Sequence, residues 1–191
     1  VIFRQRDYEG VVTGRHPRDT RSWIPALPGG GGTLQPIPLV DPQTIHPILA
    51  FRERVGEHLH LPPVSRAADA PLPLAYIGHL FEELAVAASA ENVGLSAGAA
   101  SRFEDVPVGQ CAAASPTLGA ALALAARLTS RYCGGESAWI AHRGGDVRVQ
   151  RRFPDAVRRG RRQLNDFALQ ILIDFARRAA GPHWRPAELH L

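Results

Sequence analysis

The sequence predicts an α+β fold, with a mostly helical amino-terminal half followed by a small antiparallel sheet packed on a long buried helix. Apolar residues recur at helical spacing over residues 42–55, 72–90 and 115–132, which predicts three helices. A Gly-Gly pair then separates two segments with strand character, which predicts a hairpin. A long apolar stretch that begins at Asp155 and stops at Gly181 predicts the final helix.

The first helix has a start signal, and the second has a continuous apolar stripe. Asp41 suits the N-cap position, because its carboxylate accepts hydrogen bonds from backbone N–H groups that the helix leaves free. Pro42 suits the first helical position, and Gly56 is the expected end. In the second helix the stripe predicts a face buried in the core, formed by Leu74, Ile77, Leu80, Phe81, Leu84 and Ala88.

Residues 115–132 carry the third helix. We expect Ser115 to cap it and Pro116 to occupy its first helical position. Several of its apolar positions are alanines, so a neighbouring element can approach this helix closely. Gly134–Gly135 then stop the helix. The preceding residues 108–114 are small and apolar, which predicts a short buried helix.

The hairpin is predicted from Gly144–Gly145, which suits a two-residue turn in which both residues have positive φ. This turn joins strands over residues 137–142 and 147–153 and places three pairs opposite one another: His142 and Val147, Ile140 and Val149, and Trp139 and Gln150. The apolar members of the first two pairs then share the face toward the core. Trp139 lies on the other face near Arg148, and three roles remain open for it: stacking on an arginine, packing under another element, or lining a cavity.

The final helix is predicted to be mostly buried, because apolar residues cover all but a narrow stripe of it. We expect this stripe to face solvent; it consists of Asp166, Gln170, Asp174 and Arg177. Asp174 and Arg178 have the i, i+4 spacing at which an acid followed by a base forms a favourable pair.

The length of 191 residues suits one domain or one domain with a tail, and a 45% share of apolar residues is enough to build a core. We expect residues 1–36 to be a peripheral extension with a Gly-rich linker, and residues 37–191 to be the domain. No apolar run is long enough to span a membrane, and the charged amino terminus is not a signal peptide. The chain has no Met, which indicates a fragment or a processed product.

The formal net charge of +4 comes mostly from arginines, concentrated at Arg151, Arg152, Arg158, Arg159, Arg161 and Arg162. They form either a nucleic-acid patch or a solvated helix start; the lack of interleaved aromatic residues and of a helix-turn-helix pattern favours the second. Cys111 and Cys133 have neither CxxC nor zinc spacing. We therefore expect two buried, reduced thiols, as in a cytoplasmic protein, and the alternative is a single disulfide between them.

Motifs for catalysis and metal binding are missing from the sequence. The glycines at 29–32 do not lead into the Gly-Lys-Ser/Thr of a phosphate-binding loop. His58 and His60 are spaced as two ligands on one strand, but no third ligand is recognisable, so we predict no metal site. Hydrolase, zinc-protease and dinucleotide motifs are also missing. We predict that the chain is not an enzyme and uses no cofactor.

Several segments together resemble one family. They are the helix start at Ser115–Gly119, the long helix that ends at Gly181–Pro182, the strand entry at Trp184–Pro186, and the helix within residues 71–95. In this order they resemble the amino-terminal regulatory domain of AraC-type transcriptional regulators, of the arabinose-binding-like subtype, over about residues 37–191.

The resemblance implies an effector-sensing domain that forms a homodimer in the cytoplasm and is followed by a DNA-binding domain with two helix-turn-helix motifs. That second domain is absent from this sequence, and the regulatory domain is expected to be truncated at its carboxy-terminal end. The implied partners are a small apolar or amphipathic effector and a second copy of the chain, with DNA reached only through the missing domain and no membrane. The alternative is a constitutive dimerisation module with no ligand.

We expect an effector pocket between the amino-terminal helices and the hairpin-plus-helix unit. An apolar pocket needs only a few polar anchors. The candidate ligand-binding residues are Tyr76, His79, Trp139 and Arg151, and each of them also has a structural interpretation. We expect residues 115–132 to form a wall of the pocket rather than to supply its polar contacts.

Overall fold

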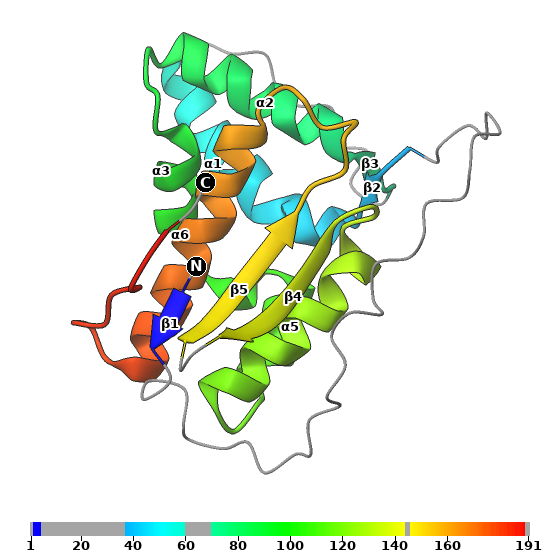
Figure 1. Cartoon of the computed structure of the whole chain (residues 1–191). Coiled ribbons are helices and arrows are strands. Elements are labelled where there is room, and N and C mark those ends of the chain that lie inside the picture. The colour runs from blue at the N-terminus through cyan, green and yellow to red at the C-terminus, as the bar shows by residue number, and fades with distance from the viewer. Residues whose placement is uncertain (1, 5–36, 60–69, 144–145, 190–191) are drawn as a thin grey trace, which may run out of the picture.

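The computed structural model describes residues 2–4, 37–59, 70–143 and 146–189 (Figure 1). Its elements are, in chain order, β1 (Ile2–Arg4), β2 (Leu39–Val40), α1 (Pro42–Leu59), β3 (Leu72–Pro73), α2 (Leu74–Ala87), α3 (Val93–Ala99), the short 3₁₀ helix η2 (Phe103–Asp105), α4 (Pro107–Ala113), α5 (Leu118–Tyr132), β4 (Ser137–Arg143), β5 (Asp146–Arg152) and α6 (Arg161–Ala180). The predicted α+β class is confirmed, because a helical amino-terminal half precedes a small antiparallel sheet and a long helix.

The main sheet is antiparallel, with β5 between β1 and β4. The predicted hairpin register is confirmed, with Trp139 opposite Gln150, Ile140 opposite Val149 and His142 opposite Val147. The Gly-Gly turn itself lies outside the described residues. Because β1 pairs only with residues 146–148, no described strand covers the rest of that edge of β5.

A second pair of strands ties the start of α1 to the end of α5. β2 and β3 pair antiparallel, and Val40 of β2 also forms a β-bridge with Cys133. The backbone N–H of Asp41 donates a hydrogen bond to the carbonyl of Tyr132 at 2.9 Å. The first turn of α1 therefore lies beside the junction between α5 and β4.

The start of α1 is confirmed, whereas its end is not. The backbone N–H of Gln43 donates to Asp41 Oδ1 at 2.9 Å, so Asp41 caps the helix as predicted. The helix continues to Leu59, because Gly56 is a buried position within the helix rather than its end. α2 begins later than predicted, since residues 72–73 pair with β2 as β3.

The predicted cap of α5 is wrong by two residues. Thr117 Oγ1 accepts a hydrogen bond from the backbone N–H of Ala120 at 3.2 Å, which makes Thr117 the N-cap. Ser115 belongs to the turn that closes α4, because its backbone N–H donates to the carbonyl of Ala112. Pro116 therefore precedes the helix instead of starting it.

α6 begins at Arg161 rather than Asp155, because Gly160 adopts a left-handed conformation with φ of 65°. The N–H of Gly160 donates to Glu82 Oε1 of α2 at 3.1 Å. A Cβ at this position would collide with the carbonyl of Gly78. This glycine therefore sets both the direction of α6 and its close approach to α2.

α3 packs closely along α6. Gln163 Oε1 accepts a hydrogen bond from the backbone N–H of Gly94 at 2.7 Å, and Gln163 Nε2 donates to the carbonyl of Glu91 at 2.9 Å. A Cβ at Gly94 would collide with the carbonyl of Gln163, and one at Gly98 would lie 2.7 Å from Gln170 Cβ. The glycines thus allow the two helix backbones to approach, and the side of α6 toward α3 is fully packed.

One member of the predicted solvent-facing stripe of α6 is buried. Asp166 is only 4% exposed, so the prediction that it is solvated is wrong. Burial raises the pKa of its carboxyl group, and Arg162, whose Nε lies 3.8 Å from Asp166 Oδ2, acts in the opposite direction.

The ion pairs of the last turns of α6 also differ from the prediction. Arg178 pairs with Glu104 of η2 at 2.8 Å rather than with Asp174. Asp174 instead pairs with Arg177 at 3.3 Å. Packing of η2 against α6 therefore decides the partner of Arg178, which the helical spacing alone does not reveal.

The two cysteines are both free, but only Cys133 is buried. The prediction for Cys111 is wrong, because this residue lies on the exposed side of α4. Residues 2–4 join the main sheet, and the rest of the predicted extension lies outside the described residues, so the domain boundary at residue 37 stays a prediction.

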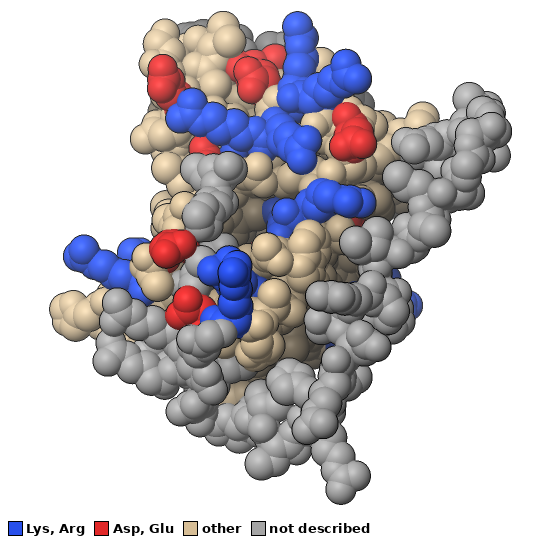
Figure 2. Space-filling model, viewed as in Figure 1, with Lys and Arg blue, Asp and Glu red and all other residues tan. Residues whose placement is uncertain are grey.

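The surface bears basic and acidic side chains side by side. Arg158, Arg159, Arg161 and Arg162 are exposed around the start of α6. Figure 2 shows arginines interspersed with acidic residues on this face rather than a continuous basic surface. None of the described helices is both long and apolar enough to cross a membrane.

Candidate functional site

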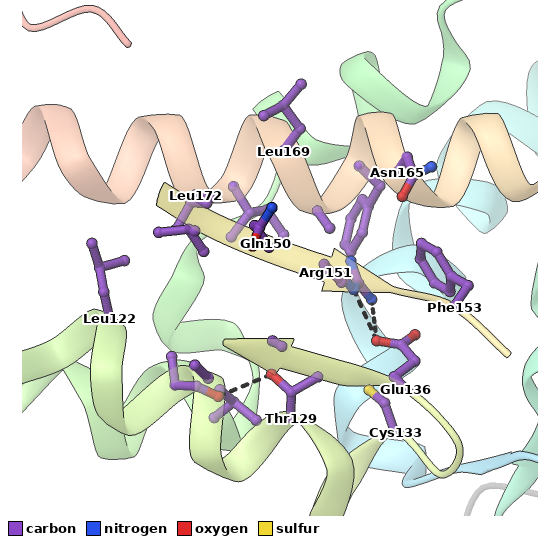
Figure 3. Close-up of a pocket in the computed structure, with 18 of the residues that line it drawn as sticks. Leu122, Thr129, Cys133, Glu136, Gln150, Arg151, Phe153, Asn165, Leu169 and Leu172 are labelled. Carbon is purple, nitrogen blue, oxygen red and sulfur yellow. Dashed lines mark hydrogen bonds and ion pairs between the residues drawn. The ribbon is translucent and has the colours of Figure 1, made fainter. Parts of the chain in front are cut away.

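A cavity of about 860 Å³ lies between α5, the hairpin and α6 (Figure 3). Its lining is mostly apolar, with further contributions from η2, α4 and the first turn of α1. Small-molecule sites usually have volumes of roughly 300–1,000 Å³ and apolar walls with a few polar groups. The cavity therefore has the size and character of a ligand site.

α5 forms one wall through Leu122, Ala125, Ala126 and Thr129. The two alanines leave space where larger side chains would fill the interior. The hydroxyl of Thr129 donates to the carbonyl of Ala125 at 2.9 Å, so it is already engaged within the helix. The middle of α5 thus supplies a wall that is apolar in character.

α6 forms the opposite wall through residues at helical spacing, among them Arg161, Asn165, Ala168 and Leu172. These four positions lie on one face of the helix. Gln163 and Gln170, which contact α3, lie on the opposite face. One helix therefore borders the cavity on one side and the closely packed α3 on the other.

β5 forms a third wall through consecutive residues 148–151. Alternate residues of a strand point to opposite faces of the sheet. The cavity therefore meets the edge and backbone of β5 as well as one of its faces. Of these residues, 149–151 lie on the part of the edge that no described strand covers.

One end of the cavity is polar. Glu136 has a fully buried side chain, and its Oε2 accepts hydrogen bonds from Arg151 Nη2 at 2.6 Å and from Arg151 Nε at 2.9 Å. The guanidinium group of Arg151 also lies over the ring of Phe153, 4.3 Å from its centre. Figure 3 shows these residues together with Cys133 at one end and Leu122, Leu169 and Leu172 toward the other.

Three buried polar atoms on the cavity lining have no hydrogen-bond partner among the described residues. They are Thr44 Oγ1, Glu136 Oε1 and Arg148 Nε. A buried polar atom without a partner costs roughly 1–3 kcal/mol, and more if the group is charged. These atoms are therefore the positions where a bound molecule gains most from forming hydrogen bonds.

The thiol of Cys133 is neutral over the physiological range. Burial, and to a smaller extent the nearby charge of Glu136, raise its pKa to about 12, although Arg151 acts in the opposite direction. A thiol with a raised pKa is a poor nucleophile. Cys133 therefore contributes an uncharged surface to the polar end of the cavity.

The comparison with protein families decides the classification. Residues 53–191 match the arabinose-binding domain at the amino terminus of AraC transcription regulators. The chain belongs to this family. No curated protein matches the chain, and no DNA-binding domain is evident in its 191 residues.

Two of the four candidate residues of this AraC-type domain line the cavity, and two do not. Trp139 and Arg151 are on its wall, although Trp139 keeps 43% of its surface exposed. Tyr76 and His79 lie on the exposed side of α2 and are not part of the lining. The predicted pocket position also differs, because the cavity lies between α5, the hairpin and α6, and the amino-terminal helices contribute only Thr44 and the region of η2 and α4.

Sequence analysis missed Glu136, although a signal was available. The predicted register places Arg151 opposite Ala138, and residues two apart on a strand share a face. Glu136 and Arg151 are therefore diagonal neighbours on the core face. Thr44 gave no such signal, since its place at the cavity depends on how α1 is tied to α5.

Among the described residues, no three His, Cys, Asp or Glu side chains are grouped as metal ligands would be. His58 is exposed near the end of α1, and His60 lies outside the described residues.

Proposed function

We propose that this chain is the effector-sensing and dimerisation domain of an AraC-type regulator, in which a small apolar or amphipathic molecule binds in the cavity between α5, the hairpin and α6. DNA is reached only through a DNA-binding domain outside this sequence, and the chain itself catalyses no reaction. The observation that carries the proposal is the largely apolar cavity, whose lining includes three buried polar atoms without a hydrogen-bond partner among the described residues.

The arrangement of α6 supports a route from the cavity to the rest of the domain. A ligand contacts the face of α6 that bears Asn165 and Ala168. The opposite face is joined to α3 through Gln163, and the start of α6 is held against α2 through Gly160. A ligand that favours one position of α6 therefore also favours one arrangement of α2 and α3, as population shift requires.

The cavity separates this proposal from the alternative of a constitutive dimerisation module. A module without an effector needs an exposed apolar face but no internal space. A cavity leaves its lining atoms without contacts and costs stability, so a purely structural domain gains nothing from keeping it.

A ligand screen by thermal shift, followed by native mass spectrometry, tests the proposal. A ligand present at about a hundred times its Kd raises Tm by roughly 5–10 °C for a domain of this size. Ala125→Phe places a ring in the cavity and is expected to abolish this rise. Ser130→Phe, on the exposed part of the same helix, is the matched control and is expected to retain it.

Two outcomes would contradict the proposal. One is that no apolar or amphipathic compound stabilises or binds the chain. The other is that compounds bind equally well to the native chain and to Ala125→Phe, which would place their site elsewhere.

A further inference from the structure

We propose that the polar end of the cavity is a subsite for the hydroxyl group of an otherwise apolar effector, with Glu136 Oε1 as the hydrogen-bond acceptor and Thr44 Oγ1 beside it. This inference rests on the proposed function and names the class of ligand that the same cavity takes.

Glu136 has one carboxylate oxygen that Arg151 does not engage. Its side chain is fully buried, and both hydrogen bonds from Arg151 go to Oε2. Oε1 is buried without a partner among the described residues, and Glu136 is part of the cavity lining. A carboxylate oxygen only accepts hydrogen bonds, so the molecule that completes this site has to bring a donor.

Thr44 contributes a second buried polar atom to the cavity lining. β2 and the start of α1 are tied to the end of α5 by the bridge between Val40 and Cys133 and by the hydrogen bond from Asp41 to Tyr132. Thr44, in the first turn of α1, therefore lines the cavity from the side of the junction between α5 and β4 that leads to Glu136, and its Oγ1 is also buried without a partner among the described residues. A hydroxyl both donates and accepts, so one ligand hydroxyl can satisfy both atoms.

At Glu136 Oε1, local charge favours a neutral donor over an ammonium group or a carboxylate. Arg148, Arg151 and Arg161 all line the cavity, and Glu136 is its single described acid. The positive balance disfavours an ammonium ligand, and a carboxylate placed at Glu136 Oε1 meets a like charge without a proton to share. A hydroxyl avoids both penalties and keeps the pair of Glu136 and Arg151 intact.

The other end of the cavity determines the chemistry of the rest of the ligand. Leu122, Leu169 and Leu172 lie there, away from Glu136 (Figure 3). An apolar chain or ring system in contact with these side chains gains by burial. The ligand class is therefore an apolar body with one terminal hydroxyl.

The test compares n-decanol with decyl methyl ether, which keeps the chain and the oxygen but lacks the donor. We expect the native chain to bind n-decanol at least about tenfold more tightly in calorimetric titration, since a hydrogen bond to a charged group decides the difference. Decanoate serves as a third probe and is expected to bind more weakly than n-decanol.

Glu136→Gln tests the acceptor directly. Arg151 requires an acceptor, so the amide oxygen is expected to take the place of Oε2 and the amide N–H₂ that of Oε1. Both probes can accept from this N–H₂, and the preference for n-decanol is expected to fall to about onefold. Ser130→Ala is the matched control, because it removes a hydroxyl from the exposed part of α5, outside the cavity lining, and is expected to leave the preference unchanged. Thr44→Val, expected to reduce the preference, keeps the test decisive if Glu136→Gln does not fold.

The outcomes separate this inference from the proposed function. Equal binding of alcohol and ether, or tighter binding of decanoate, would overturn the hydroxyl subsite while leaving a ligand cavity in place. The same applies if Glu136→Gln and Thr44→Val both fold and keep the full preference. Failure of every probe, together with a negative screen, would overturn both.

Discussion

The two sides of α6 differ in how closely they are packed. Toward α3, a Cβ at Gly94 or Gly98 would collide with α6, and Gln163 joins the two helices by hydrogen bonds. Toward α5 and the hairpin, the same helix borders a cavity of about 860 Å³. The α3 side of α6 has no room for added atoms, whereas the cavity side has room for a ligand. A closely packed contact and a cavity wall are thus combined in a single helix.

The largest expected effect comes from adding one methyl group to the packed side. Gly94→Ala puts a Cβ against the carbonyl of Gln163, and neither backbone can move without separating α3 from α6. We expect the free energy of unfolding to fall by about 3 kcal/mol, the upper part of the usual range for overpacking. Urea denaturation monitored by circular dichroism measures this loss.

The matched control is Gly181→Ala at the end of α6, where a Cβ meets no atom within 4 Å and only the positive φ of 103° is unfavourable. Residues with a Cβ in this φ and ψ region cost about 1–3 kcal/mol, and we expect the lower end of that range because the added methyl group meets no atom. Equal costs for the two variants would show that the α3 side of α6 is not closely packed.

A second prediction exchanges an amide for leucine on each side of α6. Gln163→Leu leaves the buried N–H of Gly94 and the carbonyl of Glu91 without their partner, and we expect a loss of about 2 kcal/mol. Asn165→Leu, on the cavity side, is expected to change stability by less than about 0.5 kcal/mol. Thermal or urea unfolding of both variants measures the difference, and a larger loss for Asn165→Leu would reverse the assignment of the two sides.

Much of the fold follows from local sequence signals. The Gly-Gly turn fixed the register of β4 and β5, because a two-residue turn leaves a single alignment. The errors arose where tertiary contacts override local signals. Gly160 contacts α2 and delays the start of α6, and the turn after α4 takes up Ser115 and moves the cap of α5 to Thr117.

The candidate site was less predictable than the fold. The register already implied that Glu136 and Arg151 share a face, so their pairing was within reach of the sequence. The position of the cavity was not, because it depends on how far α6 stands from β5 and α5. Tyr76 and His79 have the chemistry of polar anchors, yet their side of α2 faces away from the interior.

The smallest expected effect tests whether water reaches the polar end of the cavity. Cys133 is buried there, and its pKa is raised to about 12 from an ordinary value of 9.0, first by burial and then by Glu136. In the unfolded chain the thiol ionises near the ordinary value, whereas in the folded chain it keeps its proton. Above about pH 9 the folded state therefore binds more protons, and stability falls as the pH rises toward 12.

We expect the native chain to lose about 1 kcal/mol more than Cys133→Ala when unfolding free energies are compared between about pH 8 and pH 10. Cys111→Ala is the control, because Cys111 is exposed and its removal is expected to leave the pH dependence of the native chain unchanged. If Cys133→Ala shows the same pH dependence as the native chain, the thiol is solvated and water reaches this end of the cavity. A ligand hydroxyl at Glu136 would then compete with water, and the contrast between the two sides of α6 would be one of hydration as well as packing.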